Sequence, residues 1–317
     1  MKRGPRSTPA GQHRPVLLAE ILSALEPRPG ETAVDCTLGW AGHAVPLLER
    51  LGPAGRLIGI DFDPENLSRA RERLEAVGFP FTLHAGNFAG LSGLLASLDM
   101  AGVDVLLADL GMSSMQVDDP ERGFSYRRDG PLDMRMDRRR GRTAAQLLAT
   151  ISEADLRQAL SQLGDEPEAE RIAAAIVAAR QKQPLERTTD LARVIMQAVQ
   201  PAAKATPWRL HPSRHRWDSH PAARTFQVLR ILVNRELANL EQLLRILPSV
   251  LRPGGRAAII SFHSGEDRLV KAAFRAGLQA GDYAQVSTEP VRAGMEERTA
   301  NPRSRSAKLR WARRAGP

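Results

Sequence analysis

The chain has 317 residues, of which 42% are hydrophobic, so it is long enough to bury one large core or two ordinary ones. Its longest apolar stretches, such as residues 103–107 and 257–260, are far shorter than the roughly 18 residues of a membrane span, which excludes a transmembrane helix. The net charge of +9 and three basic clusters (residues 1–6, 134–142 and 301–314) favour a polyanionic partner such as nucleic acid, although any one cluster is equally typical of a solvated surface.

The cysteine and histidine content predicts neither a disulfide nor a metal centre. Cys36 is the single cysteine, so it has no partner for an internal disulfide or a zinc-type pair. His211, His215 and His220 stand in a stretch broken by proline and tryptophan, and we expect no metal there. Glu20 interrupts the first apolar region and no small-residue cleavage pattern follows it, so no signal peptide is predicted and a cytoplasmic location is expected.

Five short apolar segments predict the strands of a mostly parallel sheet. Each is bounded by Gly, Pro or Asp, which is typical of strands buried on both faces. They are residues 32–38, 56–62, 81–86, 103–110 and 256–262. Helical patterns over residues 43–51 and 64–78 separate the first three strands, and this βαβαβ alternation predicts a doubly wound α/β sheet.

The chain changes character between the fourth and fifth strands. Residues 143–199 are rich in Ala, Leu, Glu and Arg at helical spacing, and a proline-rich stretch follows them. We therefore expect an inserted all-helical substrate-recognition domain over residues 143–219. The flanking residues 1–142 and 220–317 are expected to form the two parts of the α/β domain, the second with a basic C-terminal end.

A long amphipathic helix is predicted from Ala222 to roughly Leu247. Its apolar stripe favours packing against the sheet over a groove for a partner. The stripe comprises Phe226, Leu229, Leu232, Val233, Leu237, Leu240 and Leu244. After the fifth strand, residues 265–279 predict a helix, and residues 283–289 and 307–313 predict two last strands as a hairpin-like edge of the sheet.

The sequence DCTLGWAGHA at residues 35–44 follows the first strand. A glycine-containing turn between a strand and a helix lets backbone N–H groups approach a ligand closely. Asp61 ends the second strand roughly 20 residues later, where a carboxylate can accept hydrogen bonds from ribose hydroxyls. The loop has neither the dinucleotide nor the triphosphate pattern. These features favour a nucleoside ligand without phosphates, above all S-adenosylmethionine (SAM), over a loop that only turns the chain.

Polar and aromatic residues also follow the third and fourth strands, whose carboxyl ends share the same edge of the sheet. They are Asn87, Phe88, Asp109, Ser113, Ser114 and Gln116. Phe88 is equally suited to pack on an adenine ring and to fill the core. Asp109 is suited to neutralise a sulfonium or an ammonium, or to cap the turn that follows it.

Blocks along the whole chain carry a family resemblance. The most specific are DLGMSSMQVDDPERGFSYRRDGPLDMRMD at residues 109–137 and HPAARTFQVLRILVNREL at residues 220–237. Further matching blocks lie at residues 13–20, 35–44, 59–67, 164–176, 259–271 and 301–310. With these blocks the chain resembles the bacterial ribosomal small-subunit RNA methyltransferase H family, also called MraW, over nearly its full length.

The resemblance implies a class I SAM-dependent methyltransferase fold, Rossmann-like, with an inserted helical domain. It implies methyl transfer from SAM to the N4 amino group of a cytidine in the decoding centre of 16S ribosomal RNA (rRNA). The partner is then 16S rRNA or the small ribosomal subunit, with no membrane partner, and a homodimer is left open. The implied cofactor contacts are Ala41, Gly42, His43, Asp61, Phe88, Asp109 and Gln116.

The chain departs from the family pattern as we know it at three positions. Trp40 stands where a small or basic residue is expected, Gly265 where a larger apolar residue is usual, and Ala223 where threonine is frequent. None of them is an implied cofactor contact. We therefore expect these departures to affect affinity more than activity.

The groups that activate the target amine are predicted by position alone. The amine of cytosine is a poor nucleophile, so acceptors near its two N–H bonds should help, and in-line positioning should supply much of the rest. The turn after the fourth strand reads DLGM and lacks the Pro-Pro-aromatic turn of other amino methyltransferases. Asp109, Ser113 and His263 are the candidates.

Recognition of RNA is expected from the helical insert together with a group of arginines. Those arginines should hold phosphates while the target cytidine turns outward. They are Arg135, Arg138, Arg139 and Arg140. Two alternatives stay open: a non-catalytic RNA-binding assembly factor with a vestigial cofactor pocket, and a methyltransferase for DNA, another RNA or a protein.

Overall fold

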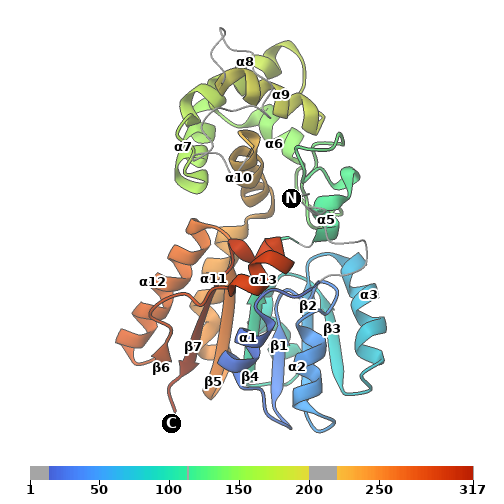
Figure 1. Ribbon diagram of the computed structural model, residues 1–317, viewed down its shortest axis with the longest axis vertical. Coiled ribbons are helices and arrows are strands. Elements are labelled where there is room, and N and C mark those ends of the chain that lie inside the picture. The colour runs from blue at the N-terminus through green and yellow to red at the C-terminus, as the bar shows by residue number, and fades with distance from the viewer. Residues whose placement is uncertain (1–13, 113, 200–219, 317) are drawn as a thin grey trace. The chain divides into compact units, whose positions relative to one another are not determined.

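The structure, a computed structural model, describes residues 14–112, 114–199 and 220–316. It divides into two compact units (Figure 1). One unit holds the described residues up to Gly111 and from Leu237 onward, and it contains the sheet. The other runs from Met112 to Glu236, and its described residues form helices and the loops between them. No helix in the described ranges is long and apolar enough to span a membrane.

Seven strands form one sheet in the order β3-β2-β1-β4-β5-β7-β6. The strands are β1 Thr32–Asp35, β2 Arg56–Asp61, β3 Phe81–Ala85, β4 Val103–Asp109, β5 Leu251–Ser261, β6 Tyr283–Val286 and β7 Lys308–Arg314. The strands β1 to β5 run parallel to one another, and β7 is antiparallel to both β5 and β6. This confirms the mostly parallel, Rossmann-like α/β fold, with the antiparallel pair at one edge.

Helices cover both faces of this sheet (Figure 1). One apolar cluster joins the sheet to α4 Leu91–Ser97, α11 Glu236–Val250 and α12 Ser264–Ala280. A second cluster joins its other face to α1 Leu18–Leu25, α2 Ala44–Leu51 and α3 Pro64–Glu75. Because both faces are covered, β1 is buried at all four residues. Two short elements follow β6 in the same unit, α13 Met295–Ala300 and the 3-10 turn η4 Pro302–Arg305.

The helical unit is wider than the expected insert at both ends. Its elements are α5 Ser114–Asp118, the 3-10 turn η2 Pro120–Arg122, α6 Ala144–Thr150, α7 Glu153–Gly164, α8 Ala169–Lys182, α9 Thr188–Val199 and α10 Ala222–Asn234. Phe124 and Leu132, which precede residue 143, pack in one core with Phe226 and Leu229, which follow residue 219. Shared burial therefore moves both boundaries outward, to Met112 and Glu236.

The single long helix expected from Ala222 to Leu247 is wrong, because two helices occupy this range. Arg235 adopts a left-handed conformation (φ 53°), which ends α10 before α11 begins at Glu236. A left-handed residue cannot continue an α-helix. The apolar stripe is consequently divided: its first half packs in the core of the helical unit and its second half packs on the sheet.

Close backbone contacts explain two glycines in the family-specific sequence at residues 109–137. A Cβ atom on Gly123 would lie 2.1 Å from the carbonyl oxygen of Pro131, and one on Gly130 would lie 1.9 Å from that of Pro120. Both distances are far below any van der Waals contact, so these positions accept only glycine. The two glycines let this segment fold back on itself.

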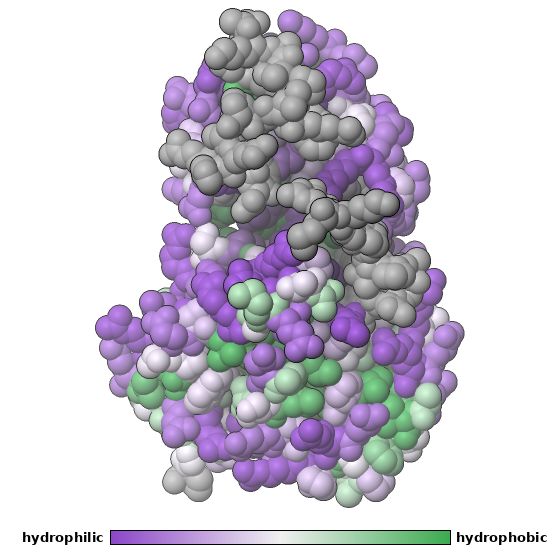
Figure 2. All heavy atoms as spheres, viewed as in Figure 1, coloured by the Kyte–Doolittle hydropathy of each residue, from purple (hydrophilic) through white to green (hydrophobic). Residues whose placement is uncertain are grey.

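The described surface in the view of Figure 2 is largely hydrophilic, with apolar residues in small groups over the sheet unit. Among the described residues, the exposed large hydrophobic side chains are those of Leu278 and Met295. Isolated residues of this kind are common on soluble surfaces. The surface thus gives no independent argument for or against a homodimer.

Candidate cofactor site

Two left-handed residues and a hydrogen bond to a carboxylate set the conformation of the loop between β1 and α2. Gly39 (φ 52°) and Ala41 (φ 59°) both lie in the left-handed region. The N–H of Gly39 donates to Asp61 Oδ2 at 2.7 Å, and the N–H of Ala41 donates to the carbonyl of Leu38 at 2.8 Å. A non-glycine residue in this conformation is uncommon and often marks a functional turn. The loop residues Ala41, Gly42 and His43 therefore have a fixed backbone at the carboxyl end of β1.

Asp61 connects this loop to the end of β2. Its Oδ1 accepts hydrogen bonds from the N–H of Asp63 at 2.8 Å and from Asn66 Nδ2 at 3.1 Å. Burial raises the pKa of Asp61 to about 6. A carboxylate can accept about four hydrogen bonds, and three protein donors leave room for a ligand hydroxyl.

Asp109 ends β4 at the same edge of the sheet. Its N–H donates to Thr37 Oγ1 at 2.6 Å, and its Oδ2 lies 3.7 Å from His43 Nδ1. Its Oδ1 is buried and has no hydrogen-bond partner in the described part of the chain. Burial raises the pKa of Asp109. A buried carboxylate oxygen without a donor is costly unless a ligand supplies one, and a cationic group would do so most effectively.

A third carboxylate, the buried Asp35, adds to the negative charge at this edge. The pKa of Asp35 is raised to about 6, mainly by burial and in part by the charges of Asp109 and Asp61, while the charge of His43 and the hydrogen bond from Thr37 oppose the rise. Like charges close together disfavour ionisation of each other. The three carboxylates therefore make this edge of the sheet suited to a positively charged ligand.

His43 links the loop to the N-terminal segment. Its Nε2 lies 2.9 Å from the carbonyl oxygen of Val16, and the ring is buried. This assigns the Nε2 proton to that contact, which leaves Nδ1 directed at Asp109. His43, a predicted cofactor contact, thus also links the loop to the N-terminal segment.

The remaining candidates are placed as follows. Phe88 begins the 3-10 turn η1 Phe88–Gly90, is partly buried and packs against the core cluster. Asn87 caps that turn by accepting from the N–H of Ala89 at 2.9 Å. Gln116 is buried on α5 in the helical unit and stays a predicted cofactor contact. Ser113 lies outside the described residues.

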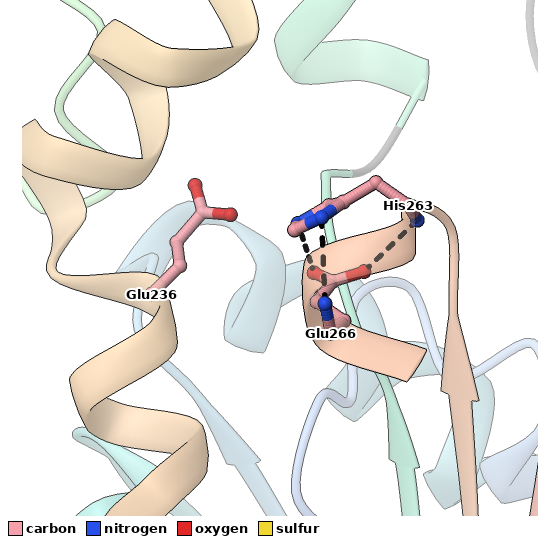
Figure 3. Close-up of side chains that lie close together, drawn as sticks. All are labelled: Glu236, His263 and Glu266. Atoms are coloured by element: carbon pink, nitrogen blue, oxygen red, sulfur yellow. Dashed lines mark hydrogen bonds and ion pairs between the residues drawn. The ribbon is translucent and has the colours of Figure 1, made fainter. Parts of the chain in front are cut away.

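His263 caps α12 (Figure 3). Its Nδ1 accepts from the N–H of Glu266 at 3.4 Å, and its Nε2 lies 3.2 Å from Glu266 Oε1. Gly265 leaves room for this ring, because a Cβ there would make a tight contact at 3.1 Å from the His263 Nδ1. Nδ1 therefore gives His263 a capping role, whereas the buried Nε2 makes no hydrogen bond within the described residues despite its proximity to Glu266; the catalytic role of His263 stays a prediction.

The His263→Asn variant separates these two roles. Asparagine is among the best N-cap residues, so the helix start should be preserved and the melting temperature should stay within a few degrees of wild type. If capping is the function of His263, kcat for methyl transfer should change less than about threefold. A loss of 100-fold or more in a folded variant would instead establish a direct catalytic role.

Two of the departures from the family pattern have local explanations. The guanidinium of Arg69 lies 4.6 Å from the centre of the Trp40 ring, and Arg73 donates to the Trp40 carbonyl at 2.7 Å. Both arginines are on α3, so Trp40 is held by cation–π and hydrogen-bond contacts with that helix. Gly265 accommodates the folded-back His263 ring. For Ala223, on α10, the structure offers no explanation.

The sequence reasoning missed two residues of this edge. Asp35 begins the sequence DCTLGWAGHA, and its signal is a carboxylate at the last position of a buried strand. Arg303 lies on η4, and its charge acts on Asp109. No local signal in the sequence could place Arg303, because its position depends on how β7 pairs with β5.

Comparisons with known proteins identify the family of the chain. The profile of the MraW methylase family matches residues 10–315. A Ribosomal RNA small subunit methyltransferase H from Geobacter sp. (strain M21) is 46% identical over 315 residues, covering 94% of this chain and 97% of the relative. One from Chromobacterium violaceum is 46% identical and covers 97% of both. A solved putative rRNA-methylase from Clostridium thermocellum aligns with a TM-score of 0.42 at 11% identity over 94% of both chains. The chain therefore belongs to the MraW methylase family.

Proposed function

We propose that this chain transfers a methyl group from SAM to the N4 amino group of a cytidine in the decoding centre of 16S rRNA. The observation that carries the proposal is the edge of the sheet where Asp35 and Asp61 are buried and Asp109 is partly buried, beside the loop at 35–44, with one buried oxygen of Asp109 lacking a donor in the described part of the chain. The relatives named Ribosomal RNA small subunit methyltransferase H support the RNA substrate.

The residues at this edge fit the chemical groups of SAM. Asp61 has room to accept a ribose hydroxyl, and the partly exposed Phe88 suits the face of an adenine. Asp109 suits the ammonium of the methionine portion, next to the backbone of the loop at Ala41–His43. Gln116 stays a cofactor contact implied by the family resemblance. The match of charge supports SAM as the ligand, since SAM carries a sulfonium and an ammonium.

The cofactor would supply an electrophilic methyl group, and the protein would position the amine for in-line attack. Asp109 and Ser113 are the proposed acceptors for the N–H bonds of the target amine, because a carboxylate has acceptor positions for both the cofactor and the amine. As the N–CH3 bond forms and the S–CH3 bond breaks, the methylated nitrogen becomes strongly acidic. Its proton can leave to Asp109 or to water, so no stronger base is needed.

Two arginines of the basic segment at 134–142 form ion pairs with nearby aspartates. Arg135 makes two hydrogen bonds to Asp133, at 2.7 and 2.9 Å, and Arg139 makes two to Asp137, at 2.9 and 3.0 Å. Arg138 is half exposed and 3.9 Å from Asp133. Of the four predicted phosphate contacts, Arg138 and the exposed Arg140 are therefore the strongest candidates.

Replacing Arg138 and Arg140 together by alanine should weaken binding of the rRNA substrate by about tenfold at low salt. The slope of log K against log salt should fall by about 2, because two phosphate contacts are lost. SAM affinity, measured by calorimetry, should stay unchanged. The matched control replaces the exposed Arg157 and Arg171 of the same unit. An equal loss in that control would show that net charge alone sets the affinity.

The proposed function is tested by transfer of labelled methyl from SAM to unmodified small ribosomal subunits, to naked 16S rRNA and to large subunits. The proposal predicts label in the small subunit or in its RNA, and none in the large subunit. Label in neither, with SAM binding demonstrated, would favour the non-catalytic assembly factor. Label in all three would contradict the substrate assignment.

A further inference from the structure

The register of the sheet places the C-terminal turn at the cofactor edge. Asp109 pairs with Ile260, and Ile260 pairs with Leu309, so β4, β5 and β7 form one row there. Because β7 is antiparallel, the residues just before it lie beyond the carboxyl ends of the parallel strands. Figure 1 shows α13 at this end of the sheet, and η4, with Arg303, lies between α13 and β7.

The N-terminal segment at residues 14–17 connects this turn to the cofactor loop. Its carbonyl at position 16 contacts His43 at 2.9 Å. Its N–H at position 17 donates to Glu297 Oε1 at 2.9 Å, and its carbonyl at position 14 accepts from Asn301 Nδ2 at 3.2 Å. The same N-terminal segment therefore contacts both the cofactor loop and the C-terminal elements α13 and η4.

The turn that carries Arg303 has a fixed backbone. Ser304 is 1% exposed, and its Oγ donates to the carbonyl of Asn301 at 2.8 Å. Asn301 is itself buried. Arg303, between them, is partly buried, and its positive charge opposes the burial that raises the pKa of Asp109.

We propose that Arg303 binds the carboxylate of the methionine portion of SAM, while Asp109 binds its ammonium. The methionine end of the cofactor carries a positive ammonium and a negative carboxylate, both attached to the same carbon atom. A guanidinium matches a carboxylate through two parallel hydrogen bonds, and a buried carboxylate matches an ammonium. The edge of the sheet thus offers one group of each sign, held by the same network. This inference rests on the proposed function and adds a specificity-determining residue to it.

Decarboxylated SAM tests the inference directly, because it lacks only the carboxylate. Calorimetry of the full chain with both ligands should show that Arg303→Ala weakens SAM binding by about 10- to 100-fold, as the loss of charge-assisted hydrogen bonds predicts. Binding of decarboxylated SAM should change less than twofold. Arg303→Lys, which keeps the charge but loses the paired donors, should give an intermediate affinity for SAM.

The matched control is Arg305→Ala, because Arg305 is exposed on the same turn and donates to the carbonyl of Arg298. It should leave both affinities unchanged. Equal weakening of both ligands by Arg303→Ala, with a lower melting temperature, would assign Arg303 to folding of the turn and overturn the inference. Unchanged SAM binding with weaker RNA binding would make it a phosphate contact and also overturn it. Failure of the wild-type chain to bind SAM would instead overturn the proposed function itself.

Discussion

Replacing Asp61 by alanine should weaken SAM binding by about 100-fold or more, which is the largest effect we expect on the cofactor. The variant loses the proposed ribose acceptor and also the carboxylate that holds the loop through Gly39 at 2.7 Å. Each hydrogen bond to a charged group contributes roughly 1.5–3 kcal/mol, so two such losses account for this factor. Calorimetry at neutral pH, with circular dichroism to establish folding, measures it.

The matched control for this variant lies at the opposite edge of the sheet. Asp104 also accepts a backbone hydrogen bond, from Thr32 at 2.8 Å, and it pairs with Arg252 at 2.8 Å. Asp104→Ala should therefore lower the melting temperature without changing SAM affinity. If Asp61→Ala binds SAM as tightly as the wild type does, Asp61 does not contact the ribose.

Asp109→Asn should reduce kcat/KM for methyl transfer by about 100- to 10,000-fold. The change preserves shape but removes the negative charge proposed to face the cofactor and the target amine. Losses of this size are typical where a group stabilises developing charge in a site that excludes water. Steady-state kinetics with saturating SAM separates this effect from weaker cofactor binding. Activity within tenfold of wild type would exclude Asp109 from the reaction.

The same variant should be more stable than wild type without cofactor, and the gain should depend on pH. Because burial raises the pKa of Asp109, the folded chain binds this proton more tightly than the unfolded chain. Both states are protonated well below the ordinary pKa of about 4, so the buried charge has no effect there. As pH rises through the folded pKa, ionisation destabilises the wild type. Denaturant unfolding should accordingly show a gain at pH 8 that disappears at low pH, and a constant difference would contradict it.

The edge of the sheet could be predicted from the sequence because the pattern is local. Short apolar strands, each ending in a polar residue, place Asp61 and Asp109 at their carboxyl ends without further information. The same holds for the loop at 35–44, where glycine and a following helix define a turn. Parallel pairing then brings these segments together, since their carboxyl ends share one edge.

The features that could not be predicted depend on contacts between distant segments. Arg235 ends α10 in a left-handed conformation with neither glycine nor proline to signal it. The pairing of Arg135 and Arg139 with aspartates two residues earlier depends on side-chain geometry that charge counting misses. Arg303 is placed only by the antiparallel register of β7 against β5.

The chemical identity of the product tests the proposed function most directly. Small ribosomal subunits or naked 16S rRNA would be treated with the purified chain and SAM carrying a trideuterated methyl group, digested to nucleosides and analysed by mass spectrometry. We expect deuterated N4-methylcytidine from the wild-type reaction and none from the Asp109→Asn reaction. Label on another atom of cytidine, on another nucleoside or on ribosomal protein would contradict it.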